Sequence, residues 1–194
     1  MRHLITPRLS AVLLALAFAA GLPPNAVKAA VIISLQESGG NVVATSSGTA
    51  NLSALTAFAS GFGGAINPGA GTLVTGANSG TAPTFYHTLT GPSSFGTGGS
   101  HLDTSGAGDF VGVAFAQDLV VTNGYVSCQP VSGTATWTGQ TFSSLGITPG
   151  VYTWTWGSGA TADSLTVATP EPVSMSFLAV GGMGLLARRR RRAL

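Results

Sequence analysis

Residues able to perform acid–base or nucleophilic chemistry are few in this chain of 194 residues. His101 and Asp103 lie near Asp109 in a glycine-rich stretch, and a histidine oriented by a carboxylate can activate a neighbouring serine. A hydroxyl nucleophile also needs an oxyanion site in fixed geometry, and the sequence contains no nucleophile-elbow spacing. A secreted serine hydrolase is therefore the weakest of the functions considered.

Asp103 and Asp109 also allow a calcium site, because Ca²⁺ takes oxygen ligands from carboxylates, backbone carbonyls and water. The acid density is far below that of an EF-hand loop, so solvated loop aspartates are favoured and no metal or cofactor is expected. A glycosidase would need two carboxylates facing one cleft, which no spacing here supports. His87 falls with Phe85 and Leu89 on one face of a predicted strand, which indicates a buried or half-buried histidine.

Aromatic residues suggest a binding function more strongly than the acids suggest catalysis. Tyr152, Trp154 and Trp156 fall on one face of a strand, and a row of aromatic faces on a rigid strand is how many carbohydrate-binding modules stack sugars. Alternating large aromatics more often fill the core between two sheets. The exposure of the two tryptophans distinguishes a stacking platform from a core.

The single cysteine, Cys128, cannot form a disulfide within the chain. It is either buried as a small hydrophobe or available for pairing between chains. Stability outside a reducing compartment must then come from sheet packing.

Charge is distributed very unevenly along the chain. All eight Lys and Arg residues lie outside residues 30–169, which carry five acids and a formal charge of −5, although the whole chain is +2. Binding to a polyanion depends on cations that neutralise phosphates, so nucleic acid is excluded as a partner. Anionic lipid is excluded on the same ground.

The N-terminus has the parts of a secretory signal peptide. Arg2 and Arg8 form a positive region, Ala11–Ala20 is an uninterrupted apolar core, and a proline pair precedes a site of small residues. Cleavage is predicted between Ala29 and Ala30. The alternative is an uncleaved N-terminal anchor.

The C-terminus combines a short polar motif, an apolar segment and an arginine cluster. The segment Val173–Ala187 is 15 residues, about 22 Å of helix, against a hydrocarbon core of about 30 Å. It is therefore a marginal membrane helix with a cytoplasmic stop. The motif is Pro170, Glu171 and Pro172, and the stop is Arg188, Arg189, Arg190, Arg191 and Arg192.

This arrangement resembles the PEP-CTERM sorting signal of bacterial exported proteins. The resemblance implies export, recognition and processing by an exosortase, which is a membrane transpeptidase, and a transient hold in the membrane. It covers only residues 170–194. The interior segment from Ile147 to Leu165 also resembles a module of many PEP-CTERM proteins, which implies no particular activity.

Three parts are predicted from these patterns: a signal peptide at 1–29, an extracytoplasmic domain at 30–169 and a sorting and anchor segment at 170–194. Many short strands with glycine-rich turns predict that the domain is all-β, a single β-sandwich or a jelly roll. The predicted strands are Val31–Leu35, Asn41–Thr45, Thr84–Thr90, Phe110–Phe115, Asp118–Val121, Val131–Trp137, Val151–Trp156 and Ser164–Ala168.

Several connections are predicted as well. Asn123-Gly124 predicts a hairpin between the strand ending at Val121 and a strand at Tyr125–Ser127. Pro149-Gly150 predicts a type II turn before Val151. Spacing in Leu52–Phe58 allows two helical turns. Long loops are expected over residues 60–80 and 91–108.

Three functions follow from the sequence. The leading hypothesis is a non-enzymatic surface or extracellular-matrix protein in an exopolysaccharide-rich envelope, with the exosortase and export machinery as partners. The alternatives are a carbohydrate-binding module, through the aromatic row, and a secreted hydrolase, through convergence of His101, Asp103 and Asp109.

Overall fold

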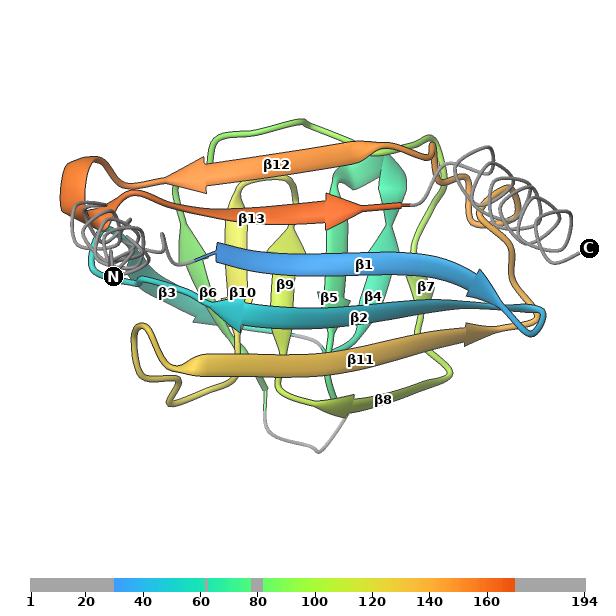
Figure 1. Ribbon diagram of the computed structural model, residues 1–194, viewed down its shortest axis with the longest axis horizontal. Helices are drawn as coiled ribbons and strands as arrows, with labels where there is room; N and C mark the ends of the chain where they lie inside the picture. Colours follow the sequence, from blue (N-terminus) through green and yellow to red (C-terminus); the bar gives the residue numbers. More distant parts are fainter. Residues whose placement is uncertain (1–29, 62, 78–81, 170–194) are drawn as a thin grey trace, which may run out of the picture.

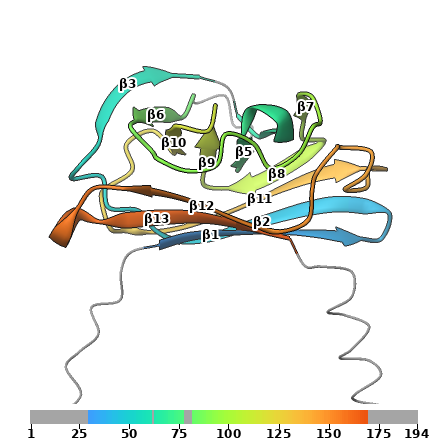
Figure 2. The ribbon, with the colours of Figure 1, turned by 90° about the horizontal axis from the view of Figure 1, so that it is seen from above.

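The computed structural model describes residues 30–61, 63–77 and 82–169, which form two β-sheets. Strands of one sheet run across those of the other in Figure 1, and Figure 2 shows the sheets stacked as two layers. An all-β, sandwich-like domain is thereby confirmed. The predictions for Ala29, for Pro170-Glu171-Pro172 and for the arginines at 188–192 lie outside the described residues.

The first sheet has six strands. β1 pairs in parallel with β13 and antiparallel with β2. Along the five longer strands the side chains alternate between the core and the outer face, as expected for one buried face. In spatial order the strands are β12 (Val151–Trp156), β13 (Asp163–Ala168), β1 (Ala30–Ser38), β2 (Asn41–Thr49), β11 (Pro130–Thr138) and β8 (Ser105–Gly108).

The second sheet has seven shorter strands. Its central strand is buried on both faces and contains Gly112, where an added Cβ would lie 2.0 Å from the Leu73 carbonyl oxygen, so only glycine fits this close approach. In spatial order the strands are β3 (Thr56–Ser60), β6 (Thr84–His87), β10 (Asp118–Val121), β9 (Val111–Ala114), β5 (Thr72–Thr75), β4 (Ala65–Asn67) and β7 (His101–Leu102).

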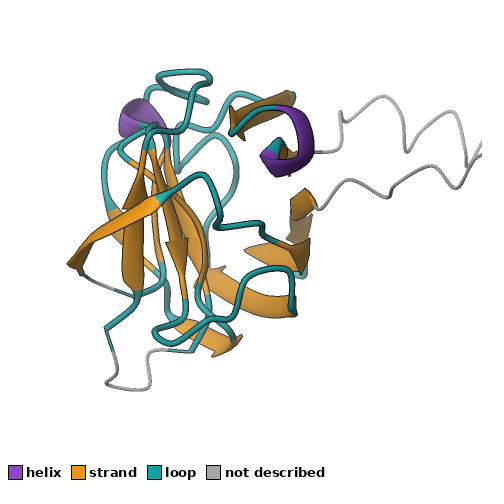
Figure 3. Cartoon of the chain, turned by 90° about the vertical axis from the view of Figure 1, so that its left-hand side faces the viewer, coloured by secondary structure: helices purple, strands orange, loops and turns teal. Residues whose placement is uncertain are grey.

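Helical structure in the described ranges is limited to two short 3₁₀ turns, Pro68–Ala70 and Gly159–Thr161, which Figure 3 shows as the purple segments. Within those ranges no helix has the length and apolar character needed to cross a membrane.

The main core lies between the two sheets. Trp137, Trp154 and Trp156 are all buried in it, and the Trp154 ring meets Phe95 edge-on with centroids 6.5 Å apart. A smaller apolar cluster covers the opposite side of the second sheet and includes Phe85, with the members Val74, Phe85, Phe110, Ala114 and Val120. The second sheet is therefore apolar on both faces.

Polar groups tie the layers together inside this core. Ser46 of β2 and Thr75 of β5 place their hydroxyl oxygens 2.7 Å apart, and one donates to the other across the sandwich. The Asp163 carboxylate accepts the backbone N–H groups of Asn51 and Ser164, both at 2.6 Å. Burial of this carboxyl group raises the pKa of Asp163, and those two hydrogen bonds offset the rise only in part.

Asp118–Val121 and Val151–Trp156 are found with the predicted ends, and the other six strands with shifted ends. The predicted hairpin at Asn123-Gly124 is wrong, because residues 125–127 do not form a strand. β10 pairs with β6 and β9 instead. Of the two turn residues only Gly124 has a positive φ, whereas the predicted type I′ turn needs both. The next residues bind another part of the chain, since the Ala50 N–H donates to the Tyr125 hydroxyl at 2.9 Å.

Other local predictions also fail. Leu52–Phe58 is not helical, because the chain turns there and continues into β3. Gly150 lacks the positive φ of a type II turn. The two expected long loops contain four strands, β4, β5, β7 and β8. These strands are only two to four residues long, and β8 is Ser-Gly-Ala-Gly, so side-chain alternation does not mark them.

Candidate ligand-binding sites

The favoured core position of Trp154 and Trp156 is confirmed, and the alternative of an aromatic stacking row is wrong for both tryptophans. Trp154 is 0 % exposed and Trp156 is buried, so neither ring can stack on a sugar. Their indole N–H groups donate to the carbonyl oxygens of Pro92 and Asn51, at 3.0 and 2.8 Å. Tyr152 is half-buried and donates its hydroxyl to a backbone carbonyl. This strand face belongs to the core because the second sheet covers it.

The residues considered for hydrolysis or calcium binding do not form one centre. Asp109 accepts the Ser132 backbone N–H at 3.0 Å, and Asp103 lies beside Gly64, where an added Cβ would come within 2.7 Å of its carboxyl carbon. The four residues of β8 lie between Asp103 and Asp109 in the sequence. Because an extended chain rises by about 3.3 Å per residue, the two acids are attached at distant points of the backbone. His101 accepts the Trp137 indole N–H through its backbone carbonyl. No cluster of three or more His, Cys, Asp or Glu side chains suited to a metal occurs among the described residues.

Cys128 is exposed and has a φ of 65°. It is not a buried hydrophobe. The Ser127 hydroxyl oxygen lies 3.7 Å from its sulfur.

A first candidate surface is the outer face of the first sheet. The strand registers align its outward residues in rows that cross the sheet. Within the described strands, the outward positions carry hydroxyl, methyl and amide groups and no charged or aromatic side chain. One row is Thr153, Thr166, Ile32, Ser47 and Ser132, and the next is Val151, Ala168, Ser34, Thr45, Thr134 and Ala107.

Seven of the eleven residues in these two rows are Ser or Thr, and the other four are Ile32, Val151, Ala107 and Ala168. Neighbouring strands are about 4.8 Å apart, and outward residues recur at about 6.6 Å along each strand. The hydroxyls of Thr153 and Thr166 lie 3.0 Å apart and hydrogen-bond within their row. We call this surface the hydroxyl face. It can donate and accept hydrogen bonds over a broad area without any net charge.

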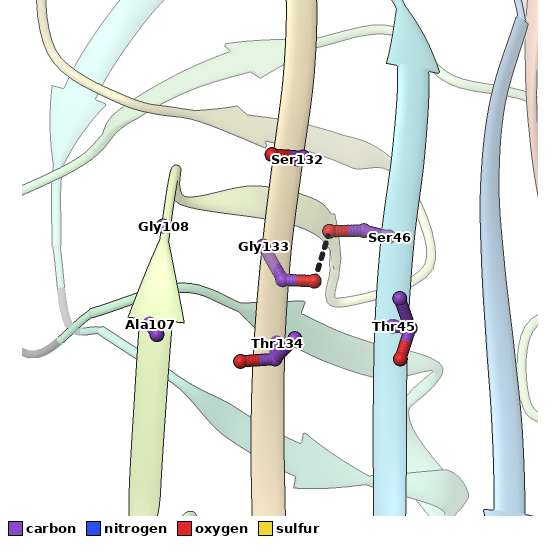
Figure 4. Close-up of a pocket in the computed structure, with 7 residues that line it drawn as sticks. All are labelled: Thr45, Ser46, Ala107, Gly108, Ser132, Gly133 and Thr134. Carbon is purple, nitrogen blue, oxygen red and sulfur yellow. Dashed lines mark hydrogen bonds between the residues drawn. The ribbon is translucent and has the colours of Figure 1, made fainter.

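A shallow hollow of about 250 Å³ interrupts the hydroxyl face between β2, β11 and β8. Figure 4 shows Thr45, Ser132 and Thr134 around it, with the hydrogen bond between the Ser46 hydroxyl and the Gly133 carbonyl below. Glycine is required here, since an added Cβ on Gly133 would lie 2.3 Å from the Asp109 carbonyl oxygen. The hollow is lined mainly by small polar residues and gives the face one concave point.

A second hollow, also of about 250 Å³, lies on the outer side of the second sheet and is lined by aromatic residues. Phe58 and Phe115 are 57 % and 54 % exposed, although both are large apolar side chains. They line the hollow together with Phe85 and Asp118. We call it the phenylalanine hollow.

A histidine–aspartate pair stands at the edge of the phenylalanine hollow. His87 Nδ1 lies 2.5 Å from Asp118 Oδ1, because Asp118 of β10 is directly opposite His87 of β6. His87 is 51 % exposed, so the prediction of a buried or half-buried side chain is wrong. Its ring also meets the Phe58 ring edge-on at 5.6 Å.

The hydroxyl face and the phenylalanine hollow were both missed at the sequence level. Outward threonines and serines were visible in the predicted strands, but only the registers show that they share rows. Phe58 and Phe115 fell in segments predicted as helical turns or as the end of a strand. A search for isolated aromatic residues outside regular alternation would have selected them.

Comparison with protein-family models, curated proteins and solved structures gave no match.

Proposed function

We propose that this chain is a non-enzymatic exported protein of the cell surface or extracellular matrix that associates with neutral exopolysaccharide through its hydroxyl face. The observation that carries the proposal is the charge-free array of hydroxyl rows on the first sheet. Polysaccharides present repeated hydroxyl groups, which match an extended array of donors and acceptors. Many weak contacts on one polymer combine into useful avidity.

Charge supports a neutral polymer over an acidic one. Residues 30–169 contain no Lys or Arg and have a formal charge of −5. Uronic or sulfated polymers would be repelled by such a domain.

Export and sorting complete the proposal. The predicted signal peptide ends at Ala29, and the segment 170–194 resembles a PEP-CTERM tail, which implies an exosortase and the export machinery as partners. A C-terminal helix over Val173–Ala187 would hold the protein in the membrane transiently before transfer to the surface or matrix. No catalytic step is part of this function.

The test is retention of the full chain on insoluble neutral and acidic polysaccharides. A triple variant, Thr45→Val, Thr134→Val and Thr153→Val, removes hydroxyls while keeping the β-branched shape. At about 0.5–1.5 kcal/mol for each hydrogen bond, retention should weaken at least about tenfold. Thr97→Val, an exposed threonine outside this sheet, is the matched control. Unchanged retention of the triple variant would refute the hydroxyl face as the binding surface.

A carbohydrate-binding module with a defined sugar site is the second candidate function. Burial of Trp154 and Trp156 removes its predicted platform. The phenylalanine hollow keeps the candidate open at a different place.

A further inference from the structure

We propose that the phenylalanine hollow binds one neutral hexopyranose ring of a polysaccharide. The proposal rests on the proposed function for its ligand class, but it lies on the other sheet and involves none of the same residues.

Phe58 is presented by a β-bulge. In the pairing of β3 with β6, Ala57 is opposite Tyr86 and Ala59 is opposite Phe85, so Phe58 is the extra residue between them. A bulge redirects a side chain and is common beside functional sites. The Phe58 ring is then held by edge-on contacts with Phe85 and His87, at 6.4 and 5.6 Å. An exposed aromatic ring is thus fixed in position before any ligand arrives.

Phe115 is presented by a strained turn. It joins β9 to β10 and has a φ of 50°, and Ala116 follows with a φ of 62°. Such turns normally use Asn or Gly, and a bulky residue at positive φ is an outlier. Strain of this kind costs about 1–3 kcal/mol and clusters at functional sites. Asn would adopt this backbone conformation with less strain than Phe, so the presence of Phe115 indicates that its ring has a function.

The chemistry of the hollow fits a sugar ring. A pyranose has faces of C–H groups and a rim of hydroxyls, so its faces can pack on Phe58 and Phe115 while a hydroxyl donates to the Asp118 carboxylate. Hydrogen bonds to a charged acceptor are the strong ones. At about 250 Å³ the hollow is smaller than the ~300–1,000 Å³ of pockets that enclose drug-sized ligands, which suits one ring of a longer chain. The adjoining carboxylate disfavours an acidic sugar.

A hydrolytic role is not supported here. Ser60 lines the hollow, but its register partner is Thr84, three residues along β6 from His87 and so about 10 Å away. Among the described residues, no serine hydroxyl contacts the His87 ring. His87 therefore acts as a positioning residue that orients Asp118 and supports Phe58.

The test uses the full chain and a β-1,4-linked glucose tetramer, a β-1,3-linked glucose tetramer and a galactose tetramer as probes. Binding is measured by calorimetry, and sugar protons in contact with the protein are identified by saturation-transfer NMR. Phe115→Asn should weaken binding at least tenfold while thermal stability stays equal or rises, because Asn tolerates the positive φ. Phe58→Ala should weaken binding similarly. Val126→Ala, at an exposed apolar residue before β11 that belongs to neither surface, should leave binding unchanged.

The possible results separate this proposal from the hydroxyl face. Loss of tetramer binding in Phe115→Asn and Phe58→Ala, with binding retained by the triple threonine variant, supports the phenylalanine hollow even if the hydroxyl face fails its own test. If Phe115→Asn and Phe58→Ala bind the tetramers normally and the triple threonine variant loses binding, the phenylalanine hollow is refuted as a sugar site and the proposed function stands. Failure of the wild-type chain to bind any of the three tetramers also overturns the hollow, as does a Phe115→Asn variant that binds normally.

Discussion

Trp154 gives the sharpest test of the fold, because its removal affects packing, a hydrogen bond and an aromatic contact together. Truncating a buried tryptophan to alanine costs about 3–5 kcal/mol. Trp154→Ala should lie at the upper end of that range, since the Pro92 carbonyl loses its indole donor and Phe95 loses its edge-on partner. A domain of this size is typically stable by about 5–15 kcal/mol, so the variant would lose a large share of its stability.

The assay is urea unfolding followed by circular dichroism. With a slope of about 2 kcal/mol/M, the midpoint should fall by about 2 M. Val151→Thr is the control, because Val151 is on the same strand but 71 % exposed, and its variant should stay within about 0.5 kcal/mol of the wild type. If Trp154→Ala prevents folding, Trp154→Phe keeps a ring and should cost about 1–3 kcal/mol through the orphaned carbonyl. A Trp154→Ala variant as stable as the wild type that no longer binds polysaccharide would refute the buried position and restore the stacking role.

Three further predictions concern charge and processing. The raised pKa of Asp163 means that the native state holds this proton more tightly than the unfolded chain, so this group's contribution to the free energy of unfolding should fall as pH rises from about 4 through the folded pKa. Asp163→Asn should flatten that part of a pH–stability curve, and an identical slope in both proteins would contradict the assignment. A protein limited to residues 30–169 should have an acidic isoelectric point and no DNA binding, and DNA retention that weakens steeply with salt would contradict this. In a host with an exosortase, Glu171→Ala should accumulate unprocessed protein, whereas wild-type protein recovered mainly with Leu194 intact would argue against the sorting signal.

The sequence was informative where a strand buries only one face. β11 points Gly133, Ala135 and Trp137 inward, and all three are buried, as expected for a strand with one face against a core. β12 likewise places Trp154 inward. Its alternation of side chains indicates that the aromatic residues share one face, but it does not indicate whether that face packs against a second sheet or lies in solvent. That choice depends on the partner layer, and no local pattern encodes it.

Local turn signals were less reliable for a comparable reason. Asn123-Gly124 does form a turn, yet the strand before it finds better partners in β6 and β9, and the chain after it crosses to the first sheet as β11. Phe58 became part of the candidate site through a register shift between two strands, and Phe115 through a strained turn. Both depend on pairing between distant segments, so neither could be read from neighbouring residues.

The two proposed sugar-binding surfaces have a geometric relation that bears on how the domain would act in a matrix. The hydroxyl face is the outer side of the first sheet, whereas the phenylalanine hollow lies beside the apolar cluster on the outer side of the second. Figure 2 shows the two sheets as stacked layers, and sheets in a sandwich are separated by about 10 Å of shared core. Surfaces on the outer sides of the two sheets therefore face away from each other. A stiff polymer lying along one surface cannot reach the other without wrapping around the domain. A domain with both surfaces occupied would therefore join two separate polysaccharide chains, and loss of either surface would leave binding to one chain while removing the link between them.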